Sequence, residues 1–114
     1  MTETMKKTLL KTLKKIEKTD EVRTCSHGKS ELIRLGGMLI ERVTFEPGWR
    51  KSTSELPADK TRRFLLHLSG TMKIIMDNDV QFEFNAGDIS RLHQCRDAWV
   101  EGNEAVVTVH FQEL

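Results

Sequence analysis

The stretch SRLHQCRDAWV, residues 90–100, places three chemically capable side chains close together. His93 and Cys95 carry atoms that ligate zinc, and Arg96 carries a fixed positive charge suited to carboxylates and phosphates. Three interpretations are open at this point: a metal site, an anion site, or a turn whose polar residues have no chemical role.

The other histidines offer a wider version of the metal hypothesis. His67 and His110 could join His93 and Cys95 in a rebuilt zinc site. No pair among them has a recognisable ligand spacing, and both His67 and His110 sit among apolar neighbours. We therefore expect these two to be hydrogen-bonded core histidines, and we expect His27, in the turn SHGKS, to be solvated.

Catalysis by a nucleophile finds little support in the sequence. Arg96 beside Cys95 would favour a thiolate, but no general base or orienting group can be identified. The chain has no Ser-His-Asp signature, phosphate-cradling glycine loop or Cys/His finger. Trp49 and Trp99 could line a pocket, but we expect both to be core anchors.

The composition indicates one soluble domain. The 114 residues carry a net charge of +1, which gives no bulk argument for nucleic acid or membrane as partner. No apolar run approaches the roughly 20 residues needed to span a bilayer, and the two cysteines suit a reducing compartment. We expect a cytoplasmic protein.

Residues 1–19 differ from the rest of the chain. Their apolar residues recur at helical spacing among many lysines, at Met5, Leu9, Leu13 and Ile16. This pattern predicts a basic amphipathic helix. A helix of this kind can contact nucleic acid or an anionic membrane, but its narrow stripe and lack of aromatic anchors favour packing on the main domain or a partner subunit.

From residue 20 to 114 the pattern alternates, as in β-strands. The short apolar runs are ELIRL, MLIERVTF, RRFLLHLS, TMKIIM, VQFEF, DISRL, DAWV and AVVTVHF. Turn signals rich in Gly, Asn and Asp separate them. In VQFEF the apolar residues share one face, and MDNDV reads as a tight hairpin. About eight short strands predict an all-β sandwich or small barrel.

Four segments in order resemble the small single-domain cupins: FEPGWR, LSGTMKIIMDND, NAGDISRL and RDAWVEGNE. The resemblance covers residues 20–112 and implies an antiparallel jelly-roll β-barrel. Cupins usually bind a divalent metal inside the barrel. As a family expectation, this chain should also form a homodimer.

Matched residue by residue, the resemblance implies that the metal site is degenerate. Arg63 stands seven positions before the glycine of LSG, where the family has a ligand, and Ser54 stands at a second ligand position. Arg96 replaces the histidine before DAWV. Because arginine stays protonated and offers no lone pair, it cannot bind a cation. We expect no metal and no other cofactor.

Arginines at the metal positions suggest a different ligand. If Arg63 points into the barrel, strand alternation turns His67 the same way, and Arg96 would enter from another strand. Buried guanidinium groups need partners. These could be a bound carboxylate or phosphate, solvent at the barrel mouth, or internal carboxylates from Glu55, Asp59 and Asp88.

The sequence therefore predicts a metal-free module that binds a small anion or is structural, without catalysis. The expected ligand-binding residues are Arg63, Arg96, His67, Ser54, Cys95 and His93. The main alternative is a metal-dependent cupin enzyme, an isomerase or dioxygenase, whose ligands have moved to His67, His93 and His110. A metal-free isomerase or epimerase using His67 or His93 as acid and base is a third hypothesis. Nucleic-acid or membrane contact through residues 1–18 ranks last.

Overall fold

The computed structural model describes residues 19–53, 64–90 and 95–113. These residues form an antiparallel all-β fold of two sheets, which confirms the predicted class. The larger sheet has six strands in the order β1 (Glu21–Cys25), β2 (Gly28–Leu35), β3 (Met38–Phe45), β9 (Val106–Glu113), β4 (Leu65–Ser69) and β7 (Ile89–Ser90). The smaller has three, in the order β6 (Gln81–Phe84), β5 (Thr71–Met76) and β8 (Cys95–Glu101). A short 3-10 turn, η1 (Lys51–Thr53), precedes the second described range.

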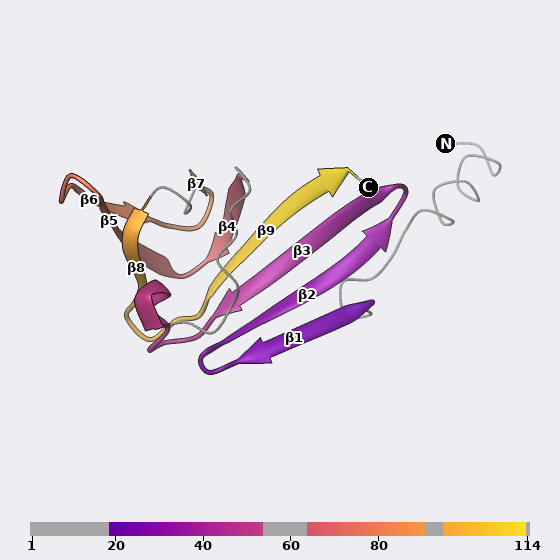
Figure 1. Ribbon diagram of the computed structural model, residues 1–114, viewed down its shortest axis with the longest axis horizontal. Helices are drawn as coiled ribbons and strands as arrows, with labels where there is room; N and C mark the ends of the chain where they lie inside the picture. The colour runs from indigo at the N-terminus through magenta and orange to yellow at the C-terminus, as the bar shows by residue number, and fades with distance from the viewer. Residues whose placement is uncertain (1–18, 54–63, 91–94, 114) are drawn as a thin grey trace.

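The two sheets overlap over only part of their length. The three-stranded sheet lies across the end of the larger sheet where β3 finishes and β9 starts, and the β2–β3 hairpin turn lies at the opposite end of the larger sheet (Figure 1). The predicted helix within residues 1–19 cannot be compared, because residues 1–18 lie outside the described ranges. In the described part of the chain, no helix has the length and apolar character to cross a bilayer.

The hydrophobic core fills the overlap. Strand alternation sends Phe45 and Val106 inward from the larger sheet and Met72 and Ile74 inward from the smaller one, and all four are buried. The Phe45 ring lies 4.4 Å from that of Trp49, centroid to centroid. Trp49 is thus a core anchor, as the sequence predicts.

Two irregularities in the strands set the direction of nearby side chains. On β4 the register against β9 shifts between His67 and Ser69, which is a β-bulge. The chain then turns into β5 at Gly70, whose φ is 71°. A Cβ there would lie 2.5 Å from the carbonyl oxygen of Ala105, so only glycine fits this crossing between the sheets.

The outer face of the larger sheet carries a buried ion pair. Arg42 on β3 donates two hydrogen bonds to Glu31 on β2, at 3.0 and 2.8 Å. The hydrogen bond from Arg42 holds the pKa of Glu31 below its usual value, although burial acts in the opposite direction. The pair joins two neighbouring strands outside the core.

Candidate functional site

His67 lies on the inner face of the larger sheet, on the strand next to its β7 edge. Its side chain is on β4 and is fully buried. Its Nε2 lies 2.6 Å from the hydroxyl oxygen of Ser90 on β7, a hydrogen bond that fixes the ring. This confirms the expectation of a hydrogen-bonded core histidine.

The loop between β6 and β7 positions both partners of the His67 ring. The backbone N–H of His67 donates to the carbonyl of Asp88, and its own carbonyl accepts from the N–H of Gly87. The ring of Phe84, on the strand before this loop, stacks on the imidazole at 5.3 Å between centroids and 12° between planes. One loop therefore ties a histidine, its aromatic neighbour and its hydroxyl partner together.

Thr108 on β9 is the cross-strand neighbour of His67. Both side chains are fully buried, and neither Nδ1 of His67 nor Oγ1 of Thr108 has a hydrogen-bond partner among the described residues. Directly opposed residues in an antiparallel pair have Cβ atoms about 4.5–5.5 Å apart. Two unsatisfied polar atoms thus share one small region between the sheets.

The surroundings of His67 favour the neutral form of its imidazole. Burial lowers the pKa of its imidazole below the ordinary value, and the carboxylate of Asp88 opposes that effect without overcoming it. The side-chain carboxylate of Asp88 accepts a hydrogen bond from the N–H of Asn85 at 2.8 Å, so it is engaged within its own loop. Asp88 thus stabilises the turn to which it belongs.

The polar region continues along the inner face. The register places Ser30, Val43, Thr108 and His67 in one row across four strands. The hydroxyl of Ser30 is also buried without a hydrogen-bond partner among the described residues. In the next row, Nδ1 of the buried His110 lies 3.5 Å from a carboxylate oxygen of Glu41.

Cys95 begins β8 and is buried. The ammonium of Lys51 on η1 donates to the carbonyl oxygen of Cys95 at 2.7 Å and lies 3.5 Å from its sulfur. Burial raises the pKa of the Cys95 thiol, and the nearby ammonium offsets only part of this. Cys95 is therefore a protonated thiol at neutral pH, which does not suit a nucleophile.

The structure corrects the expected direction of Arg96. Ile75 pairs with Asp97 but Met76 pairs with Cys95, so Arg96 is an extra residue in a β-bulge. The bulge turns Cys95 inward and Arg96 to the surface, where its guanidinium pairs with the carboxylate of Asp79 in the β5–β6 turn. The prediction that Arg96 enters the barrel is wrong.

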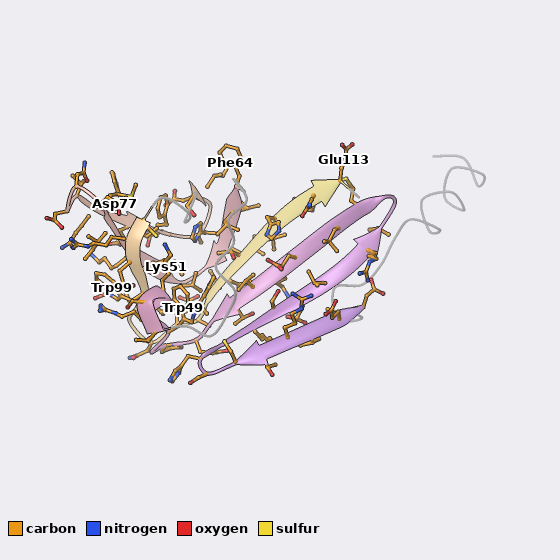
Figure 2. All side chains as sticks on the ribbon, in the orientation of Figure 1. Trp49, Lys51, Phe64, Asp77, Trp99 and Glu113 are labelled. Carbon is orange, nitrogen blue, oxygen red and sulfur yellow. The ribbon has the colours of Figure 1, made fainter. Side chains whose placement is uncertain are left out.

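Figure 2 shows where η1 meets β8, with Trp49, Lys51 and Trp99 labelled at that end of the molecule. The N–H of Ser52 donates to Asp97 at 3.0 Å. The guanidinium of Arg50 lies 4.7 Å from the centre of the Trp99 ring. Trp99 is half-buried under this cation, on the opposite face of the small sheet from the core. It is not the core anchor that the sequence suggested.

Of the other expected binding residues, Arg63, Ser54 and His93 lie outside the described ranges. No motif in the sequence points to Ser90, Thr108 and Lys51, because their contacts with the site depend on how distant segments pair. The alternation of β9 does point Thr108 the same way as Val106 and His110, but only the register reveals its partner on β4.

The described residues contain no group of side chains that could ligate the divalent metal of a typical cupin. In residues 19–53, 64–90 and 95–113, no three side chains from His, Cys, Asp and Glu gather where they could hold an ion. Ser90 and Thr108, the hydrogen-bonded and cross-strand neighbours of His67, offer hydroxyls, which are weak ligands for a transition metal compared with imidazole and carboxylate. Ser54 and Arg63, at the ligand positions that the cupin resemblance implies, and His93 of the alternative set lie outside these ranges.

Comparison with known proteins gives likeness of fold. No known family profile matches the chain, and no curated protein matches it by sequence. Among solved structures, oxalate decarboxylase from Lactobacillus farciminis, a formate complex, has 16% identity and a TM-score of 0.55, over 80% of this chain and 30% of that one. The chain thus spans less than a third of that enzyme.

Two further structures are similar. An HTH_3 family transcriptional regulator from Vibrio cholerae has 17% identity and a TM-score of 0.51, over 77% of this chain and 51% of that one. An RmlC-like cupin protein from Desulfovibrio desulfuricans has 15% identity and a TM-score of 0.50, over 86% of this chain and 95% of that one. Enzymes and a regulator share the fold, so the fold alone does not assign an activity.

Proposed function

We propose that this chain, which has the cupin fold, is a metal-free module that binds a small carboxylate-bearing molecule between its two sheets. The observation that carries the proposal is the pair of unsatisfied polar atoms, Nδ1 of His67 and Oγ1 of Thr108. A buried polar atom without a partner costs about 1–3 kcal/mol. A ligand oxygen that bonds to both atoms would recover this free energy, and a carboxylate can accept from both.

The surroundings of the two atoms suit the apolar part of such a ligand. Phe84 covers one face of the imidazole, and Ile74 is buried on the facing sheet. Phe82 pairs with Ile74 and so shares its inward face, yet it remains 50% exposed. Small-molecule sites typically combine apolar walls with a few placed polar groups.

In this proposal Arg63 supplies the positive charge that pairs with the carboxylate of the ligand. The resemblance to cupins matches Arg63 to a metal-ligand position, and a continued strand alternation would give it the direction of His67. A guanidinium binds a carboxylate through two parallel hydrogen bonds. Arg96, paired with Asp79 at the surface, is not part of the site.

A thermal-shift screen tests the proposal with acetate, propionate, benzoate and inorganic phosphate. A ligand at 100 times its dissociation constant stabilises by about 2.7 kcal/mol. We expect a carboxylate to raise the melting temperature of the wild type, and the Arg63→Ala and Thr108→Val variants to lose most of the shift. Arg96→Ala is the matched control, because it removes the same charge outside the site, and it should keep the full shift.

Two results would overturn this function. The first is that no carboxylate stabilises the wild type, and the second is that Arg96→Ala loses the shift while Arg63→Ala keeps it. The alternative, a metal enzyme with ligands at His67, His93 and His110, is tested by metal analysis of tag-free protein. Near-stoichiometric iron, zinc or manganese that is lost on replacing two of these histidines with alanine would favour that alternative.

A further inference from the structure

We propose that the site takes up its carboxylate together with one proton, and that the proton is held on the His67 imidazole. The inference rests on the proposed function and adds how binding is regulated. The two nitrogen atoms of the ring then have separate roles. Nε2 holds the ring in place through Ser90, and Nδ1 presents the proton to the ligand.

The hydrogen-bond geometry accepts either charge state of the ring. A serine hydroxyl is both donor and acceptor, so Ser90 can donate to a bare Nε2 or accept from a protonated one without moving. Nδ1 has no hydrogen-bond partner among the described residues, so nothing described there competes with a ligand oxygen. In the doubly protonated ring both nitrogens are donors, which matches a hydroxyl on one side and a carboxylate on the other.

The charged groups around the ring leave it neutral until an anion arrives. From the loop before β7, Asp88 is the nearby carboxylate, and it favours the charged ring. From β9 and β3, Thr108 is uncharged, and the next row carries His110, whose Nδ1 lies 3.5 Å from a carboxylate oxygen of Glu41.

From β6, Phe84 is apolar, and its neighbour Glu83 points to the opposite face, where it pairs with Lys73 at 3.0 Å. The net effect of burial is a lowered pKa for His67, so the empty site lacks a charge on this ring at neutral pH. A carboxylate beside Nδ1 supplies the missing opposite charge and raises that pKa again. Binding and protonation therefore favour each other.

The direction of the pH dependence follows from this linkage. The bound form holds one more proton than the free form at any pH between the two pKa values of His67. Affinity should then fall as the pH rises, by up to about tenfold for each pH unit. Below the lowered pKa of the free protein the ring is already charged, and the dependence should flatten.

Isothermal titration calorimetry with benzoate tests the inference. Titrations at pH 6.0, 7.0 and 8.0, each in two buffers with different ionisation enthalpies, report the affinity and the protons taken up. Benzamide, which has the same shape without the charge, is the control ligand. We expect close to one proton taken up with benzoate, none with benzamide, and an affinity for benzoate that falls as the pH rises.

The His67→Asn variant separates binding from proton uptake. Asparagine can keep a donor near the position of Nδ1 but does not titrate, so the variant should bind benzoate more weakly, with no proton uptake and no pH dependence. A ring NMR titration of His67 in the wild type, with and without benzoate, gives the same answer if the variant does not fold. The His67 pKa should be higher with benzoate present.

The outcomes distinguish the two proposals. Benzoate binding without proton uptake, or proton uptake that persists in His67→Asn, would overturn the inference and leave the proposed function standing. An unchanged His67 titration in the presence of bound benzoate would do the same. If no carboxylate binds at any pH, the proposed function fails and the inference fails with it.

Discussion

Replacing Thr108 with valine should stabilise the protein in the absence of ligand. Valine has nearly the shape of threonine and puts a methyl group where the hydroxyl is. The hydroxyl of Thr108 is fully buried and has no hydrogen-bond partner among the described residues. Most core substitutions destabilise a protein, so a gain in stability here would be a specific signature of an unsatisfied group.

The size of the gain follows from the burial of that hydroxyl. An unsatisfied buried hydroxyl costs about 1–3 kcal/mol, and burying a methyl group in its place contributes about 0.8 kcal/mol. Small steric adjustments reduce the sum, so we expect a net gain of about 1–2 kcal/mol. For a domain of this size, each kcal/mol raises the melting temperature by roughly 4 °C or more.

Urea denaturation followed by circular dichroism measures the change, with Thr71→Val as the matched control. The hydroxyl of Thr71 donates to Asn85 at 2.8 Å, so the same substitution there removes a made hydrogen bond. It should cost about 0.5–1.5 kcal/mol. The reasoning is refuted if Thr108→Val is as destabilising as Thr71→Val, because the hydroxyl of Thr108 would then be satisfied in the ligand-free protein.

Three other substitutions test the remaining structural arguments. Gly70→Ala should destabilise the protein by several kcal/mol, because its Cβ would meet a backbone carbonyl at 2.5 Å. Gly36→Ala has open space around its Cβ and should cost only about 1 kcal/mol, for its positive φ. Equal losses of the two variants in urea denaturation would contradict this. Arg42→Ala should cost about 1–2 kcal/mol, because Glu31 loses both hydrogen bonds from Arg42 and keeps only Lys29, whose ammonium lies 3.7 Å away. The loss should shrink as the pH falls through the range where Glu31 takes up a proton, and a loss independent of pH argues against the pair. Because the pKa of His67 is lower in the native state than in the unfolded state, the unfolded state binds the extra proton, and wild-type stability should drop as the pH falls below about 6.5. His67→Asn should lose less stability over that range. Parallel curves of unfolding free energy against pH for the two proteins would exclude His67 as the source of the drop.

Much of the fold follows from local patterns in the sequence. The alternation in VQFEF and the turn signals of MDNDV predict the strand that forms β6 and the hairpin that precedes it. Asp79 adopts a φ of 67°, which aspartate tolerates better than most residues. His67 is buried as expected, since it stands in a segment that alternates clearly. Trp49 is also buried as expected, although it lies in the turn after β3.

The candidate site was harder to predict, because a bulge changes which face a residue occupies. Counting back by twos from the inward Val100 and Ala98 places Arg96 inside the barrel. One extra residue in β8 reverses that count, so Cys95 is buried and Arg96 pairs with Asp79. The contact between His67 and Thr108 joins residues 41 positions apart, and no local pattern carries that information.

At the bulge in β4, the number of residues matters more than the type of side chain. The register of β4 against β9 shifts between His67 and Ser69, so β4 has one residue more than β9 just before the chain crosses to β5 in the second sheet. A deletion at Leu68 would remove the extra residue and straighten β4 against β9, which would change how the chain approaches the turn into β5 at Gly70. In natural variants, insertions and deletions should therefore be rarer across this step than substitutions of Leu68 itself, whose side chain is 49% exposed.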